Sequence, residues 1–206
     1  MTDPATGDLA AVWAELLPGR SSLGAELLER WSEPHRHYHD TSHLRAALVA
    51  LDELGGAARA ERLAIWFHDA IHTGRPGRDE RESAALAVLR LTDGGLAQGE
   101  VAEVSRLVLV TIDHSPAADD EAGARVSDAD LAILGAAPER YRASVAALRA
   151  EAGTDADSWR AARLARLVAL LAAEPLFHTA TGRHRWLAIA RANLAAEQQA
   201  LLAATP

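Results

Sequence analysis

Two reactive side chains are missing from this chain of 206 residues: it contains no cysteine, and all 21 of its basic residues are arginine. The absence of cysteine excludes disulfides, thiolate metal sites and a cysteine nucleophile. The absence of lysine excludes Schiff-base chemistry and a P-loop, since both need a lysine amine. The chain also lacks a G-x-S-x-G nucleophile elbow, an H-E-x-x-H zinc motif and a glycine-rich dinucleotide loop after a strand. A serine triad and a dinucleotide-binding enzyme are therefore not predicted.

Long apolar runs and excess positive charge are also lacking. No stretch approaches the roughly 20 uninterrupted apolar residues that cross a bilayer, and the amino-terminal MTDPATGDLAAVW has no basic segment followed by an apolar run, as a secretory signal would. The net charge of −8 at pH 7 argues against extended nucleic acid, because phosphate neutralisation needs a basic surface. We therefore expect a cytoplasmic protein with neither a membrane nor a nucleic-acid partner, in which a few arginines could still hold a small anionic ligand.

Helical periodicity runs through the whole chain. The segments in which apolar residues recur at spacings of three and four are 8–17, 22–31, 42–54, 58–71, 80–91, 99–112, 138–152, 157–173 and 183 to about 204. The connections between them are rich in Gly, Pro, Asp and Thr, and the longest are 72–79 and 113–126. We predict an all-α fold, a compact single-domain helical bundle over residues 1–206.

Three of the nine histidines fall within RHYHDTSHL, residues 36–44. Asp40 or Ser42 is a good N-cap for the helix that begins near residue 42, which places His43 in the first turn and His39 just before it. If the helix starts earlier, a spacing of four puts His39 and His43 on one face. In either case the two side chains can point at one site.

Further candidate ligands lie in IWFHDA and VSDADLAILG. His68 and Asp69 are adjacent near the end of an apolar helix, where a charged aspartate is costly unless it is paired or bound to a metal. Asp128 and Asp130 follow a polar loop and precede an apolar segment. With His43, these residues offer two imidazoles and two carboxylates. Such a mixed set suits Mn, Fe, Co, Ni, Zn or Mg and leaves coordination positions open for water and substrate.

Three motifs follow one another in a set order: HLRAAL, then HDA after an apolar run, then DADLAILG. This order resembles the H...HD...D pattern of the HD superfamily of metal-dependent phosphohydrolases. The surrounding EPHRHYHDTSHL, AIWFHDAIH and DERESA are similar to a bacterial subgroup described as predicted HD-superfamily metal-dependent phosphohydrolases. The resemblance covers a motif core at about residues 31–134, on which the helices of 138–204 are expected to pack. It implies an HD-type helical bundle and the hydrolysis of a small phosphate ester such as a nucleotide.

The resemblance also implies a ligand set for one divalent ion, which could be Mn, Fe, Ni, Co, Zn or Mg: His43, His68, Asp69 and Asp128. His43 is preferred to His39 because it opens the HLRAAL helix. Asp128 is preferred to Asp130 because the first aspartate of DAD is the ligand in related sequences. One ion is expected, since relatives with two carry extra histidines between HD and the final aspartate, and the segment 80–91 contains none.

Hydrolysis at such a centre needs an oriented water, proton transfer and positive charge near the phosphate oxygens. Asp69 is expected to orient the water as well as to bind the metal. The candidates for acid and base work are His72, Asp79 and Glu82. The candidates for substrate binding are Arg36, His39, Arg75, Arg78 and His114. Glu80 is expected only to stabilise the start of its helix.

Two other functions fit the same residues. The first is a metal-dependent oxygenase or lyase on the same scaffold, which a tightly held iron pair would indicate. The second is a non-catalytic helical protein that binds a metal or a nucleotide, which an intact site without turnover would indicate. The sequence is compatible with a monomer or a homodimer.

Overall fold

Helices joined by turns and loops make up the residues that the structure, a computed structural model, describes: 8–55 and 58–203. No strand occurs within these ranges, which confirms the all-α prediction. Tertiary contacts divide the chain into two compact units, Met1–Asp130 and Leu131–Pro206, here called unit 1 and unit 2. The division of the chain into a motif core and packed carboxy-terminal helices stays a prediction.

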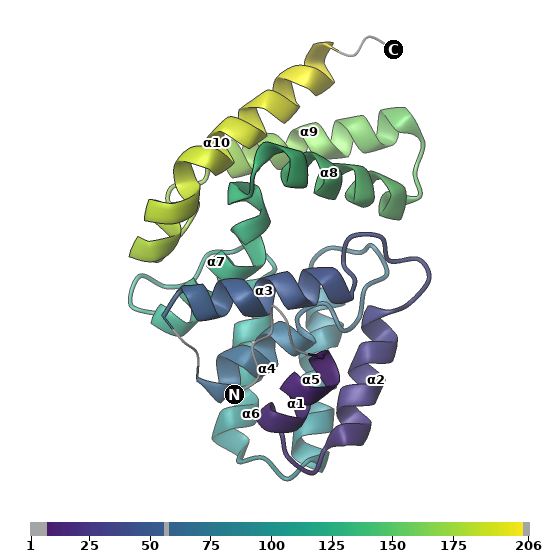
Figure 1. Ribbon diagram of the computed structural model, residues 1–206, viewed down its shortest axis with the longest axis vertical. Helices are drawn as coiled ribbons and strands as arrows, with labels where there is room; N and C mark the ends of the chain where they lie inside the picture. Colours follow the sequence, from purple (N-terminus) through teal and green to yellow (C-terminus); the bar gives the residue numbers. More distant parts are fainter. Residues whose placement is uncertain (1–7, 56–57, 204–206) are drawn as a thin grey trace. The chain divides into compact units, whose positions relative to one another are not determined.

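Unit 1 is built from the helices drawn in purple to teal in Figure 1. They are α1 (Leu9–Leu16), α2 (Ser21–Trp31), α3 (Thr41–Glu53), α4 (Arg59–Phe67), α5 (Asp79–Asp93), α6 (Gln98–Val110) and α7 (Glu121–Asp130). Helix α4 is central, because it packs against α1, α3, α5, α6 and α7.

The sequence of α4 explains its central position. Leu63, Ala64, Ile65, Trp66 and Phe67 follow one another and are all 0% exposed. A helix that is apolar all round is stable only when it is buried on every side. Helix α4 therefore lies in the interior of unit 1. The residues that follow Phe67 are attached to its buried end.

Two differences between the predicted and the observed helices bear on the site. The helix expected over 58–71 ends at Phe67, and the residues after it turn, with the Ala70 N–H donating to the Phe67 carbonyl oxygen at 2.9 Å. The segment 113–126 was expected to be a loop, but α7 begins within it at Glu121. The apolar periodicity does not reveal α7 because the buried face of this helix includes the small or polar residues Gly123 and Ser127.

Unit 2 consists of η1 (Leu131–Gly135), α8 (Pro138–Ala152), α9 (Ala156–Ala172) and α10 (Ala180–Ala203). Helix α10 packs against η1 and α9. The Glu197 carboxylate of α10 accepts hydrogen bonds from Tyr141 of α8 and from Arg163 of α9, where the Arg163 Nε to Glu197 Oε1 distance is 2.7 Å. This nearly buried network joins the three long helices of unit 2. All the site residues that the sequence predicts belong to unit 1.

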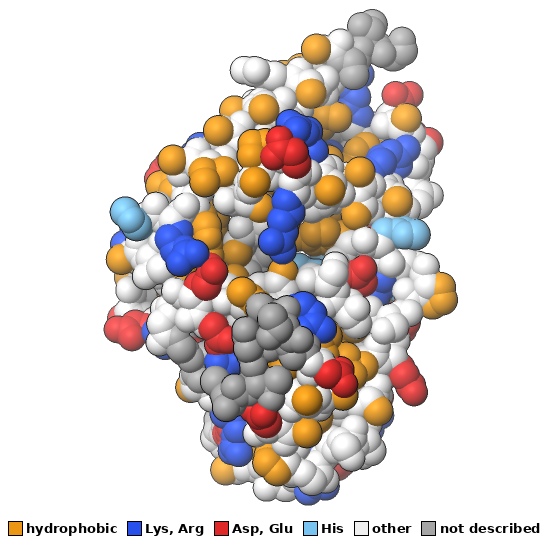
Figure 2. Space-filling view, in the orientation of Figure 1, with side chains coloured by type: hydrophobic (Ala, Val, Ile, Leu, Met, Phe, Trp, Pro, Cys, Tyr) orange, Lys and Arg blue, Asp and Glu red, His pale blue; other side chains and the backbone are white. Residues whose placement is uncertain are grey.

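The surface carries charges of both signs. On the face drawn in Figure 2, arginine and acidic side chains are interspersed rather than gathered into a basic patch. None of the described helices combines the length and the apolar character that a membrane span requires.

Candidate metal centre

The first candidate ligand is placed by the N-cap of α3. The Asp40 Oδ1 atom accepts hydrogen bonds from the backbone N–H groups of Ser42 and His43, at 2.8 and 3.3 Å. Asp40 is therefore the cap, one of the two residues that the sequence proposed, and such a cap stabilises a helix by about 1 kcal/mol. His43 lies in the first turn of α3, as expected, and only 6% of it is exposed.

The next two candidates lie at the end of α4. The His68 backbone N–H donates to the Ala64 carbonyl oxygen at 2.8 Å, and His68 Nδ1 is 2.9 Å from the Ile65 carbonyl oxygen. Because a carbonyl oxygen only accepts, Nδ1 carries the proton in this contact, and in the neutral ring Nε2 keeps its lone pair. This is the arrangement by which proteins orient a histidine ligand. Asp69 Oδ2 lies 3.0 Å from that Nε2 atom.

Four donor atoms converge at this point, and we call His43, His68, Asp69 and Asp130 the His/Asp cluster. The Nε2 atoms of His43 and His68 are 3.2 Å apart. Asp69 Oδ2 is 3.8 Å from His43 Nε2. Asp130 Oδ1 is 3.1 Å from His43 Nε2 and 3.5 Å from His68 Nε2. Donors bound about 2.0–2.2 Å from one ion lie roughly 3–4 Å from one another, so these spacings fit a single divalent cation.

The aspartate at the cluster is Asp130, which the sequence ranked second, rather than the preferred Asp128. Both residues lie in the last turn of α7, and residues two positions apart point about 200° apart around a helix. The Asp130 carboxylate faces the two imidazoles, while Asp128 is 0% exposed among the buried residues of α7. Asp130 therefore joins the candidate ligand set on the distances, and the ligand role of Asp128 stays a prediction.

The buried charged groups of the cluster shift one another's pKa values. Burial by itself would raise the pKa values of Asp69 and Asp130, but the positive charge of His68 outweighs it and lowers the pKa of both carboxyls. Burial likewise acts to lower the pKa of His68, yet the two carboxylates raise it well above its ordinary value of 6.5. The two carboxylates thus stabilise positive charge between them, and a divalent cation bound by neutral imidazoles would supply that charge equally well.

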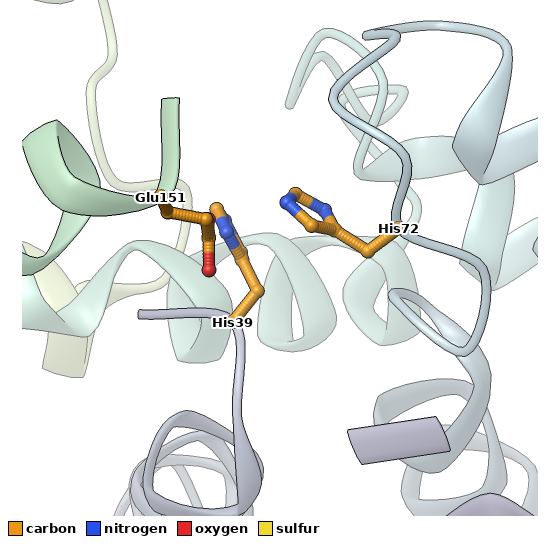
Figure 3. A group of neighbouring side chains, drawn as sticks. All are labelled: His39, His72 and Glu151. Atoms are coloured by element: carbon orange, nitrogen blue, oxygen red, sulfur yellow. The ribbon is translucent and has the colours of Figure 1, made fainter. Parts of the chain in front are cut away.

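The neighbouring histidines line one side of the cluster. The rings of His39 and His43 have centroids 5.6 Å apart, and the rings of His39 and His72 are 4.2 Å apart. Figure 3 shows His39 and His72 with their rings turned toward each other; its third labelled residue, Glu151, belongs to α8 in unit 2. His35 Nε2 is 2.8 Å from the His72 carbonyl oxygen, which fixes the backbone there. His39 and His72 are half-buried, so both predicted residues lie beside the cluster at the edge of the solvent.

Arg36, predicted to bind substrate, has a structural position instead. Its guanidinium donates to the carbonyl oxygens of His39 and Asp69, at 3.0 and 2.8 Å, and more weakly to that of Ala70 at 3.4 Å. The Nε group donates to Glu33, and the Arg36 side chain is 0% exposed. The guanidinium therefore ties the loop before α3 to the turn that carries Asp69 and presents no face to a substrate.

The other two predicted arginines point away from this arrangement into solvent. Arg78 forms a 2.7 Å ion pair with Glu82, and the two side chains are 61% and 45% exposed. Arg75 is exposed as well, and its backbone N–H, rather than its side chain, is used in the loop. Glu82, expected to transfer protons, is therefore part of a surface ion pair on the first turn of α5.

Asp79, also predicted to act as an acid or base, organises the loop before α5. Its carboxylate accepts hydrogen bonds from the Thr73 N–H and hydroxyl, both at 2.7 Å, and from the Arg75 N–H at 2.8 Å. Burial would raise the pKa of Asp79, but these hydrogen bonds outweigh it and lower the pKa below the ordinary value of 3.8. A carboxylate held in this way is a poor proton carrier near neutral pH.

The lowered pKa of Asp79 predicts an acid-dependent loss of stability. Because the folded-state pKa is below the unfolded-state value, the stabilisation is present above about pH 5 and is lost as the pH falls below 3.8 through the folded-state pKa. Asp79→Asn should lower the free energy of unfolding by roughly 1–2 kcal/mol at pH 7, and the difference from wild type should shrink toward about pH 3. Urea denaturation across this range measures it. The control is Asp93→Asn, at the exposed far end of α5, and a pH-independent difference for Asp79→Asn would contradict the assignment.

Glu80 is the residue that the sequence analysis missed. It was expected only to stabilise a helix, but its side chain is half-buried and its Oε2 atom is buried without a hydrogen-bond partner in the part of the chain that the structure describes. Burial raises the pKa of Glu80, and the negative charge of Asp69 raises it further. Glu80 differs from Asp79 and Glu82 in how the folded protein buries its side chain. The local sequence DERES does not reveal that burial.

His114, predicted to lie in the pocket, reaches the cluster from the loop between α6 and α7. Its Nε2 atom is 3.7 Å from Asp130 Oδ2, and its side chain is 10% exposed. The structure therefore brings His114 to the cluster together with His39 and His72.

Comparisons with the models of protein families, with curated proteins and with solved structures return no match. The chemistry of the site therefore rests on its own geometry: His43, His68 and Asp69 could hold a divalent ion, and the Asp130 carboxylate lies beside the two imidazoles.

Proposed function

We propose that this chain is a metal-dependent hydrolase of a small phosphate ester. The observation that carries the proposal is the convergence of donor atoms from three separate segments, α3, the end of α4 and the end of α7, on one point. Burying two carboxylates costs stability unless positive charge lies beside them, and either a protonated His68 or a bound cation would supply it. The HD resemblance of the sequence, which implies His43, His68 and Asp69 together with Asp128, supports a metal centre at the same place in the chain.

The proposed mechanism divides the work among these side chains. His43, His68, Asp69 and Asp130 would hold one divalent ion, which when bound supplies an acidified water and polarises a phosphoryl oxygen. Asp69, as a carboxylate at all pH values near neutrality, would accept a hydrogen bond from the attacking water. His39 and His72 lie beside the cluster with ring N–H groups suited to the oxygens of a phosphate.

Proton transfer to the leaving oxygen is assigned to Glu80 rather than to Asp79 or Glu82. Asp79 is held ionised by its hydrogen bonds, and Glu82 is paired at the surface. Glu80 has a raised pKa and a buried oxygen without a partner within the described residues, so it keeps its proton to a higher pH than an exposed glutamate does. A general acid is most effective when its pKa lies near the working pH.

The test combines metal analysis with hydrolysis. After incubation with Mn²⁺, Co²⁺, Ni²⁺ or Zn²⁺ and removal of free ion, the wild type should retain about one equivalent per chain and hydrolyse p-nitrophenyl phosphate or a member of a nucleoside phosphate panel. His68→Ala should lose both properties, while His184→Ala, a matched change at an exposed histidine of α10, should keep both.

The other outcomes separate the remaining functions. Retention of the ion without hydrolysis of any phosphate ester would favour the metal-binding or sensor function. Two iron ions per chain with oxygen consumption would favour the oxygenase. If the wild type bound no ion, the proposed metal centre would be wrong.

A further inference from the structure

His114 has an unusual backbone conformation. Among the described residues other than glycine it alone has a positive φ, 56°. Its N–H donates to the Val110 carbonyl oxygen at 2.9 Å, as the chain leaves α6. The left-handed region disfavours side chains with a Cβ atom, and glycine occupies it at lower cost than histidine does. Such strain persists where the surroundings fix it, and it is concentrated at functional sites.

The ring of His114 is held by two residues of α7. Its Nδ1 atom is 3.3 Å from the hydroxyl of Ser127, which is 0% exposed, and its Nε2 atom is 3.7 Å from Asp130 Oδ2. Ser127 and Asp130 are three residues apart and so lie on one face of the helix. The contact between Nε2 and Asp130 Oδ2, at 3.7 Å, is electrostatic and longer than a hydrogen bond, while the Ser127 hydroxyl can donate to Nδ1.

Asp130 needs such a partner because of its place in the fold. It is the last residue of α7, where the negative end of the helix dipole disfavours a carboxylate. Its two oxygens face different groups: Oδ1 lies 3.1 Å from His43 Nε2, and Oδ2 faces His114. The ring of His114 beside Oδ2 therefore favours the orientation in which Oδ1, the atom assigned to the metal, faces His43.

We propose that His114 is a positioning residue that orients Asp130 for metal binding, and that its left-handed backbone is retained because it turns the ring back toward α7. The proposal rests on the metal centre proposed above. It assigns His114 a task different from substrate binding, since the ring acts on the metal through Asp130.

Two amide variants separate positioning from stability. Asparagine tolerates the left-handed backbone and places its amide near the Nδ1 position, but it is too short to reach Asp130. Glutamine reaches the Nε2 position but tolerates the backbone less well. For each variant we would measure the melting temperature of the metal-free protein, and the dissociation constant of Co²⁺ or Zn²⁺ by competition with a chromophoric chelator.

The expected results run in opposite directions. His114→Asn should keep the melting temperature of the wild type while its affinity for the ion falls by about 10–100-fold, as is usual when a partner of a ligand is removed. His114→Gln should melt at a lower temperature while its affinity stays within about threefold of wild type.

Two results would overturn the proposal in distinguishable ways. If the wild type binds the ion and His114→Asn binds it equally well, or if affinity follows melting temperature in both variants, His114 is structural only. If the wild type binds no divalent ion, the metal centre is absent and the role of His114 falls with it.

Discussion

Asp130→Asn is expected to weaken the binding of a divalent ion by more than about 100-fold, since loss of an outer partner of a metal ligand already costs about 10–100-fold. The substitution keeps the size of the side chain and removes the negative charge that lies 3.1 Å from His43 Nε2 and 3.5 Å from His68 Nε2. A neutral amide oxygen is a weaker ligand for a divalent cation than a carboxylate is.

Asp128→Asn is the matched control for this prediction, because it makes the same chemical change two residues away on the same helix. Asp128 is buried in α7 and points about 200° from Asp130 around the helix axis. Its variant should bind the ion within about threefold of wild type, whatever it does to the melting temperature. Affinities measured by chelator competition at one pH decide between the two aspartates. A loss confined to Asp128→Asn would restore the ligand that the sequence preferred.

The sequence predicts the centre of this site well and its edges poorly, for a physical reason. His68 and Asp69 stand out because charge directly after the apolar run Leu63–Phe67 has few structural explanations, and this run is fully buried. His43 stands out because a strong N-cap fixes where its helix begins. Both inferences depend on residues that are neighbours in the sequence, so they can be made from the sequence alone.

The choice between Asp128 and Asp130 depends on which side of α7 faces α3 and α4. The sequence does not reveal α7 as a helix, because Gly123 and Ser127 occupy part of its buried face where a periodic pattern would need large apolar residues. Without the helix, two aspartates in DAD are equivalent candidates, and family resemblance alone ranked them.

The roles of Arg36 and Glu80 depend on contacts between distant segments. Arg36 looks like a phosphate ligand in a loop rich in histidine, but its guanidinium is taken up by carbonyl groups 33 and 34 residues further along the chain. Glu80 and Glu82 have the same side chain two positions apart, and burial distinguishes a carboxyl whose pKa is raised from one that is paired at the surface.

The second large effect is expected at Arg36. Arg36→Met removes a buried guanidinium and leaves the carbonyl oxygens of His39 and Asp69 without their donor, so it should lower the free energy of unfolding by roughly 3 kcal/mol. Arg36→Lys keeps the charge but offers one ammonium in place of a planar fork, so it should recover only part of this loss. Urea denaturation of the metal-free protein measures both.

The same substitutions should also weaken metal binding, because Arg36 connects the two segments that place His43 and Asp69. Arg78→Met is the control: this arginine lies in the same unit, is 61% exposed and pairs with Glu82, so its loss should change the free energy of unfolding by less than about 0.5 kcal/mol. If Arg36→Met were as stable as Arg78→Met but failed to bind or hydrolyse a phosphate ester, the guanidinium would be a substrate ligand after all. If Arg36→Met lost stability and metal affinity together, as expected, Arg36 would act by holding the loop before α3 against the turn after α4. The ion would then depend on both segments keeping their positions.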